Sequence, residues 1–232
     1  MSTATVPPET TLVDVVNFLH PGQRCLLTEV AWEDYERLLA WRDEYRPSVR
    51  LTYDRGGLEV MPVSFRHERL RKVLDLLIAA WVEETGGEYF ANGQLTHLRK
   101  DLERAFEPDE CYYLRNWKKV AALREIDFRT DPPPDLSVEI EHTRPLLDKR
   151  GVFAAFKMPE VWRYDGNDVS VLLLQPSGEY QKSPVSLAIP NFPFADASPF
   201  LALVHDPATS FADIARRFRA WIRSLPPTAP TT

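Results

Sequence analysis

Residues 135–141, DLSVEIE, alternate strictly between polar and apolar positions, and this pattern predicts a β-strand. The apolar residues share one face, and the polar residues, among them Glu139 and Glu141, share the other. Such a strand is typical of a sheet edge with its polar face in water. However, two carboxylates two residues apart repel each other unless a positive charge lies between them. A divalent cation or the ammonium of Lys149 would supply that charge, so the pattern also fits a functional site.

A helix and a second strand are predicted after this strand. Apolar residues from Leu146 onward follow helical spacing up to Pro159, and residues 161–164 form a short extended run. A strand, a helix and a strand within about 30 residues can form a parallel crossover unit. In that unit we expect the carboxylate face to be exposed beside the helix.

The same two periodicities predict the other elements of the chain. Helices are expected over residues 32–43, 64–84 and 211–225, with Thr28, Ser64 and Ser210 as N-caps. Strands are expected over residues 48–53, 58–63, 89–91, 94–98, 111–114, 169–174 and 180–184. Residues 116–130 have some helical character, and the proline-containing residues 185–200 are expected to form a loop.

Composition indicates one soluble domain. The 232 residues are 44% hydrophobic and 27% charged, and no apolar run is long enough to span a membrane. We expect an N-terminal arm over residues 1–27, a single domain over 28–225 and a disordered tail over 226–232, which is rich in Pro and Thr. The N-terminus lacks the features of a secretory signal. Cys25 and Cys111 lack metal-ligand spacing and fit a reducing cytoplasm, although the two could pair.

The formal net charge of -6 is unfavourable for a protein that binds nucleic acid. Three local groups of basic residues exist: Arg66, Arg69, Arg71 and Lys72; Arg99, Lys100 and Arg104; and Arg115, Lys118 and Lys119. Such groups are more often solvated faces than binding patches. The charge therefore does not support DNA as a partner, and it does not exclude an enzyme whose acidic pocket is neutralised by a metal ion.

Four residues form the candidate site. Asp109 precedes one predicted strand, Glu139 and Glu141 lie on another, and Lys149 lies on or just before the following helix. Carboxylates from different strands, with a neighbouring carbonyl, could bind one or two Mg²⁺ or Mn²⁺ ions, and a nearby lysine could orient or deprotonate water. His67 should point inward from the helix over residues 64–84. A histidine in that position is usually a hydrogen-bonded core residue, although it would also suit a phosphate or a metal-bound carboxylate.

Three segments resemble the Uma-type restriction endonuclease family, a branch of the PD-(D/E)XK nuclease superfamily: EPDECYYL at 107–114, PDLSVEIEHT at 134–143 and LDKRGVFAAFKMPEVWRYDG at 147–166. SFRHERL at 64–70 is similar to the motif that opens the family's first helix. The resemblance spans residues 28–222. Sequence departures at Phe153 and at residues 157–158 lie away from the acidic residues.

The resemblance implies roles for individual residues. Asp109 matches the superfamily's first aspartate, Glu139 its second acidic residue, and His67 the histidine of the first helix. Glu141 stands where the superfamily carries lysine, and Lys149 matches the displaced lysine of the family. The resemblance thus implies Asp109, Glu139, Lys149 and His67 as catalytic residues. Asp109, Glu139 and Glu141 are the candidate metal ligands.

The resemblance also implies a fold and an activity. The fold would be an α/β restriction-endonuclease-like core, in which a mixed central β-sheet of four or five strands is flanked by helices. The activity would be Mg²⁺-dependent cleavage of DNA by a cytoplasmic enzyme, which we expect to be a homodimer. An alternative is a binding or regulatory module that keeps the nuclease scaffold without its chemistry, as the negative charge and the displaced lysine suggest. A hydrolase of another phosphoester is a third possibility.

Overall fold

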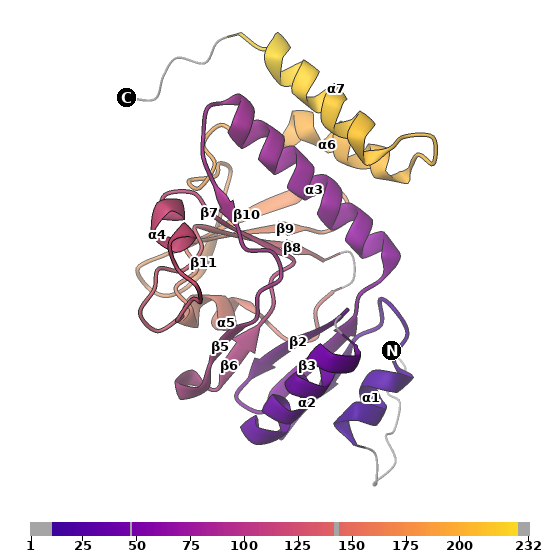
Figure 1. Cartoon of the computed structure of the whole chain (residues 1–232), viewed down its shortest axis with the longest axis vertical. Helices are drawn as coiled ribbons and strands as arrows, with labels where there is room; N and C mark the ends of the chain where they lie inside the picture. Colours follow the sequence, from indigo (N-terminus) through magenta and orange to yellow (C-terminus); the bar gives the residue numbers. More distant parts are fainter. Residues whose placement is uncertain (1–10, 47, 142–143, 227–232) are drawn as a thin grey trace.

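The computed structural model describes residues 11–46, 48–141 and 144–226, which form two β-sheets flanked by helices (Figure 1). The mixed α/β architecture predicted from the sequence is confirmed. The sequence led us to expect one mixed sheet of four or five strands, whereas the mixed sheet has six and a second sheet has five.

The five-stranded sheet is antiparallel. In spatial order its strands are β1 (Cys25–Leu27), β3 (Gly57–Pro62), β2 (Val49–Asp54), β6 (Arg104–Phe106) and β5 (His97–Arg99). Helix α2 (Trp32–Tyr45) packs on this sheet, and α1 (Leu12–Phe18) packs on α2. At the centre of this core the ring of Tyr35 stacks on that of Tyr53, with 5.0 Å between centroids. The predicted hairpin of β2 and β3 is confirmed.

The six-stranded sheet carries the predicted crossover unit. Its strands are, in spatial order, β11 (Tyr180–Ser183), β10 (Val169–Leu174), β9 (Glu160–Tyr164), β8 (Leu136–Ile140), β7 (Glu110–Tyr113) and β4 (Phe90–Ala91). Strands β8 and β9 are parallel and are connected through α5 (Arg150–Ala155), whereas the other pairs are antiparallel. Helix α4 (Trp117–Ala121) contacts β4 of this sheet, whereas the short 3₁₀ turn η1 (Lys100–Leu102) connects β5 to β6 of the five-stranded sheet.

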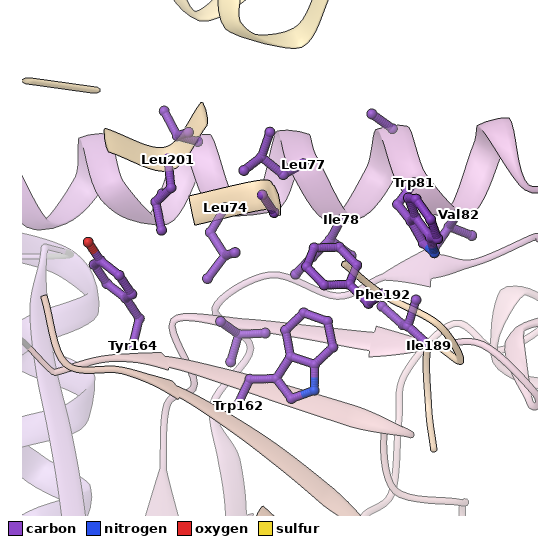
Figure 2. Close-up of a cluster of buried hydrophobic side chains, with 14 of the residues drawn as sticks. Leu74, Leu77, Ile78, Trp81, Val82, Trp162, Tyr164, Ile189, Phe192 and Leu201 are labelled. Carbon is purple, nitrogen blue, oxygen red and sulfur yellow. The ribbon is translucent and has the colours of Figure 1, made fainter. Parts of the chain in front are cut away.

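Helix α3 (Phe65–Glu84) covers one face of the mixed sheet. Ser64 caps it by accepting a hydrogen bond from the His67 N–H at 3.2 Å, as predicted. Its apolar stripe, which includes Leu74, Ile78 and Trp81, packs toward Trp162 of β9 (Figure 2). Helices α6 (Phe194–Ala202) and α7 (Phe211–Ser224), joined by the 3₁₀ turn η2 (Leu203–His205), complete this layer.

Strand β8 differs from the expected edge strand. It lies between β7 and β9, and all five of its residues are buried. Its apolar face packs toward α3, and its other face lies on the side of α5, where Val152 and Phe153 form a second core cluster. The expectation of a solvent-exposed carboxylate face is therefore wrong, because helices cover both faces of the sheet.

Several element boundaries also differ from the predictions. Helix α6 occupies part of the segment expected to be a loop, and β6 was not predicted. Helix α5 is shorter than expected because Lys149 is its N-cap, and α2 is preceded by Ala31 rather than Thr28 as N-cap.

The segment expected to be an N-terminal arm contains α1 and β1. Val16 of α1 is fully buried, and β1 pairs with β3. Of the predicted tail over 226–232, residues 227–232 lie outside the described residues, and the division into arm, domain and tail stays a prediction. The thiols of Cys25 and Cys111 are both free. No helix in the described part of the chain has the length and apolar character needed to cross a membrane.

Candidate active site

Asp109 lies directly before β7, opposite Glu139. The antiparallel register of β7 and β8 pairs Glu110 with Val138, and one further step along it places Asp109 across from Glu139. Asp109 Oδ2 accepts a hydrogen bond from the Ile140 N–H at 2.7 Å. This contact fixes the Asp109 carboxylate at the end of β8, beside the second acidic residue of the predicted site.

His67 lies in the first turn of α3 and points inward, as its place on the apolar stripe predicted. Its Nε2 donates a hydrogen bond to Asp109 Oδ1 at 2.8 Å, and both side chains are buried. Burial opposes ionisation of Asp109. The contact with His67, the charge of Lys149 and the Ile140 N–H outweigh that penalty and lower the pKa of Asp109 to about 2. Asp109 is therefore a carboxylate at neutral pH.

The two carboxylate oxygens of Glu139 have different surroundings. Oε2 accepts a hydrogen bond from Lys149 Nζ at 2.9 Å. Oε1 is buried and has no hydrogen-bond partner among the described residues. Burial raises the pKa of Glu139 to about 7, and the Asp109 charge adds to the rise, while Lys149 opposes it. A buried carboxylate with one unpaired oxygen is a position at which a cation would be stabilised.

Lys149 is buried beside three carboxylates. Burial would lower the pKa of its ammonium, but Glu139, Glu59 and Asp109 together raise it. Lys149 is therefore a cation in the folded protein. Its position at the N-cap of α5 brings it to Glu139 across the crossover connection.

Glu141 follows β8 and contacts a different partner. Its Oε2 accepts a hydrogen bond from Arg163 Nε at 2.9 Å, and the two side chains form an ion pair. The structure thus brings His67, Asp109, Glu139 and Lys149 into one connected group. Glu141 lies beside that group, and the contact recorded for its carboxylate is the one with Arg163.

Two buried glutamates support the site and were not recognised in the sequence. Glu59 of β3 accepts hydrogen bonds from the Leu146 N–H at 2.5 Å and the Leu147 N–H at 3.1 Å, and it pairs with Arg24. It therefore holds the segment that leads to Lys149 against the five-stranded sheet. The available signal was a glutamate within an otherwise apolar strand pattern, LEVMP.

Glu107 fixes the segment before Asp109, as Glu59 fixes the segment before Lys149. Its carboxylate accepts hydrogen bonds from the Leu51 N–H at 3.1 Å and the Thr96 hydroxyl at 2.8 Å, and it forms an ion pair with Arg42. The segment that precedes Asp109 is thereby fixed to β2. Glu107 belongs to the EPDECYYL segment, but its sequence position alone indicates no role.

The donor set fits a Mg²⁺ ion. The described residues contain no cluster of three or more His, Cys, Asp and Glu side chains suited to a metal. Mg²⁺, however, commonly takes only one or two carboxylates and keeps several waters. Asp109 and Glu139, whose Oε1 has no hydrogen-bond partner among the described residues, supply carboxylate oxygens of that kind.

Comparison with known proteins identifies the family. The Uma2 family, described as "Putative restriction endonuclease", matches residues 32–199 of this chain. The chain belongs to the Uma2 family. The resemblance seen in the sequence is thus confirmed, and His67, Asp109, Glu139 and Lys149 lie within the matched range.

One solved structure similar to this Uma2 protein is a "putative nuclease belonging to DUF820 from Anabaena variabilis ATCC 29413". It is 15% identical, the alignment covers 82% of this chain and 99% of that chain, and the TM-score is 0.44. No curated protein matches this Uma2 protein.

Proposed function

We propose that this protein is a Mg²⁺-dependent DNA endonuclease of the PD-(D/E)XK type, able to use Mn²⁺ as well. The observation that most supports this proposal is the environment of the Glu139 carboxylate. Its Oε1 is buried with no hydrogen-bond partner in the described part of the chain, its Oε2 is 2.9 Å from Lys149 Nζ, and Asp109 lies opposite in the strand register. Two carboxylates and an ammonium in one buried group suit hydrolysis of a phosphodiester.

Each residue has a role in this proposal. Asp109 and Glu139 hold the metal ion, and His67 keeps the Asp109 carboxylate oriented through its 2.8 Å hydrogen bond. When bound, Mg²⁺ lowers the pKa of water and offsets the negative charge that develops on the phosphoryl group. Glu141 remains a candidate third ligand, which would first have to exchange its contact with Arg163.

Lys149 acts through its positive charge. Because its neighbours raise the pKa of the ammonium, it is protonated at neutral pH and is not suited to remove a proton from water. It can donate a hydrogen bond to the attacking water and stabilise charge on the phosphoryl oxygens.

The test is nicking of supercoiled plasmid DNA in Mg²⁺ or Mn²⁺. Glu139→Gln keeps the size of the side chain but weakens a metal ligand, so we expect a loss of several orders of magnitude in rate. Glu179→Gln changes an exposed glutamate in the turn between β10 and β11 and is the matched control. Equal nicking by the wild type and Glu139→Gln would exclude the proposal.

A second candidate function is a binding or regulatory module that retains the fold without catalysis. The ion pair of Glu139 with Lys149 favours it, because the pair neutralises part of the acidic group without a metal. The net charge of -6 also favours it. Titration calorimetry distinguishes the two: a module of this kind would bind neither Mg²⁺ nor Mn²⁺, whereas the nuclease would.

We also propose that the protein acts in the cytoplasm as a homodimer. A dimer would present two sites to the two strands of a duplex. Sedimentation of the purified protein, with and without duplex DNA, tests this. A monomer under both conditions would contradict it.

A further inference from the structure

A pocket of about 330 Å³ lies beside the candidate active site, where β8 and β9 end. Lys149 contributes to its wall, and so do Glu141, Arg144, Arg150 and Arg163. Since Lys149 also donates to Glu139, this lysine belongs both to the wall of the pocket and to the group of residues proposed to be catalytic.

Arg163 lies next to Glu139 on the neighbouring strand. The parallel register of β8 and β9 pairs Glu139 with Arg163, and paired residues project from the same face of a sheet. The neighbouring residues agree with this: Val161 belongs to the core cluster on the α5 side, whereas Trp162 belongs to the cluster beneath α3. Arg163 therefore shares the face of Glu139, and its side chain is 39% exposed.

The wall of this pocket is positively charged, whereas the molecule as a whole is negatively charged. Its ionisable side chains are four basic ones (Arg144, Lys149, Arg150 and Arg163) and two acidic ones (Glu141 and Asp148). With Glu139, the partner of Lys149, included, the balance is +1, whereas the chain carries a net charge of -6. Local positive charge in an acidic protein favours an anionic ligand at that place.

Two of these arginines have N–H groups that could donate hydrogen bonds to a ligand. Arg144 is exposed and has no ion-pair partner among the described residues. Arg163 contacts Glu141 Oε2 through Nε and one Nη, which leaves other N–H groups of its five for a ligand. A guanidinium held by a carboxylate on one side and free on the other is pre-organised for bidentate contact with a phosphate.

We propose that this pocket binds a backbone phosphate of the DNA and that Arg163 is its positioning residue. In this arrangement Glu141 stays paired with Arg163 and holds the guanidinium in place, and it is then not a metal ligand, while the exposed Arg144 adds positive charge. The phosphate would be a neighbour of the one that is cleaved, so its capture would align the scissile bond with Glu139 and Lys149. This inference rests on the proposed function, because it assumes a nucleic-acid substrate.

The experiment measures binding of a short fluorescent duplex at several salt concentrations, with Ca²⁺ replacing Mg²⁺. For Arg163→Ala we expect affinity to fall about 10- to 100-fold, the size of a charged hydrogen-bond contact. The slope of log K against log salt should decrease by about 0.9, the contribution of one phosphate. Arg163→Lys should keep most of the slope but lose affinity, since lysine cannot make a bidentate contact.

A second variant, Arg144→Ala, tests the proposal in case Arg163→Ala does not fold. Arg163→Ala leaves the nearly buried Glu141 without its partner, whereas Arg144→Ala removes an exposed side chain and should also reduce affinity and slope. The matched control is Arg216→Ala, because Arg216 is 75% exposed on α7 and pairs only with Asp213 among the described residues. Its affinity and slope should equal those of the wild type.

The outcomes separate this inference from the nuclease proposal. Unchanged affinity and slope in both Arg163→Ala and Arg144→Ala would overturn the subsite even if plasmid nicking persists. Reduced binding in these variants, together with a wild type that never nicks DNA, would support the subsite and exclude the nuclease. Calorimetric binding of inorganic phosphate by a wild type that does not bind the duplex would assign the pocket to a small phosphate ligand and overturn the inference.

Discussion

The buried ion pair of Glu139 and Lys149 is the central feature at the scale of single residues. Each member is nearly inaccessible to water, so each charge depends on the other for compensation. Because Glu139 Oε1 has no partner among the described residues, the pair satisfies only half of the carboxylate. The energetic coupling of the two side chains should therefore be large.

We predict that Lys149→Met and Glu139→Gln each reduce the free energy of unfolding by about 3 kcal/mol, because each leaves a buried group without its partner. The double variant should lose about 1–3 kcal/mol less than the sum of the two, since no uncompensated charge remains. Urea denaturation of the four proteins measures this. Additive losses, within about 0.5 kcal/mol, would mean that the pair is not coupled.

His97 is a buried histidine outside the candidate site. Its ring stacks on Phe128 at 4.1 Å and on Phe106 at 4.7 Å between centroids, and its Nδ1 donates to the Leu95 carbonyl at 2.9 Å. Its Nε2 is buried with no partner among the described residues. Burial lowers the pKa of His97 from 6.5 to about 4, so the neutral ring is the stable form.

This pKa predicts a loss of stability in acid. Between pH 6.5 and about 4 the unfolded chain binds the proton and the folded protein does not, so acidification favours unfolding. The contribution of His97 is complete above pH 6.5 and is lost as the pH falls through about 4, by up to about 3 kcal/mol. His97→Phe should keep the stack and remove this dependence. If the stability difference between wild type and variant is the same at both ends of that range, the ring does not titrate as described.

At the scale of elements, the site depends on connections between the two sheets. Glu59 of β3 accepts from the Leu146 and Leu147 N–H groups, residues 87 and 88 positions away in the chain. The segment so fixed leads directly to Lys149 at the start of α5. The five-stranded sheet therefore supports Lys149, which pairs with Glu139 of the other sheet.

We predict that Glu59→Ala releases this segment. The amide hydrogens of Leu146 and Leu147 should exchange at least about tenfold faster, because they lose the carboxylate that accepts them. If the protein is the proposed nuclease, DNA cleavage should fall as Lys149 loses its fixed position, whereas Mg²⁺ affinity should change little, because the proposed ligands Asp109 and Glu139 are not held by Glu59. Exchange measured by NMR, with Glu179→Ala as a surface control, tests this. Unchanged exchange at both amides would contradict the tethering role.

Local patterns explain which elements could be predicted. The alternation in β8 and the apolar stripe of α3 are properties of neighbouring residues, and both elements were found with nearly correct bounds. Helix α6 was missed because Pro199 lies within it and proline disfavours helix interiors. The burial of Ala197 and Leu201 against the core outweighs that cost.

Only those residues of the candidate site that lie in recognisable sequence motifs could be predicted. Asp109, Glu139, Lys149 and His67 occur in segments that resemble a family, so their grouping could be expected. The burial of Glu139 could not, because it depends on strands and helices that cover β8 from both sides. The main-chain N–H groups that Glu59 and Glu107 accept from lie more than 50 positions away in the chain, at Leu146, Leu147 and Leu51, beyond any local pattern.

At the scale of the whole molecule, the layer above α3 extends beyond the family match. The match ends at residue 199, yet Ile214, Phe218 and Ile222 of α7 belong to the same core cluster as α3 and the mixed sheet. Arg219 and Arg223 add ion pairs to Glu83 and Glu84 at the end of α3. Figure 1 places α7 on α3, on the side away from the mixed sheet and α5. Helix α7 should therefore contribute to stability and not to chemistry.

We predict that Phe218→Ala lowers the free energy of unfolding by about 3–5 kcal/mol, the cost of a cavity left by a buried ring. Phe218 is fully buried and stacks on Trp221 at 5.4 Å, whereas Phe211, on the same helix, is 36% exposed. Phe211→Ala should therefore cost less than about 1 kcal/mol and is the matched control. Denaturation by urea measures both losses, and calorimetry on the folded variants should find Mg²⁺ affinity unchanged. A Phe218→Ala protein that keeps its stability but binds Mg²⁺ more weakly would mean that α7 acts on the site and does not merely cover α3.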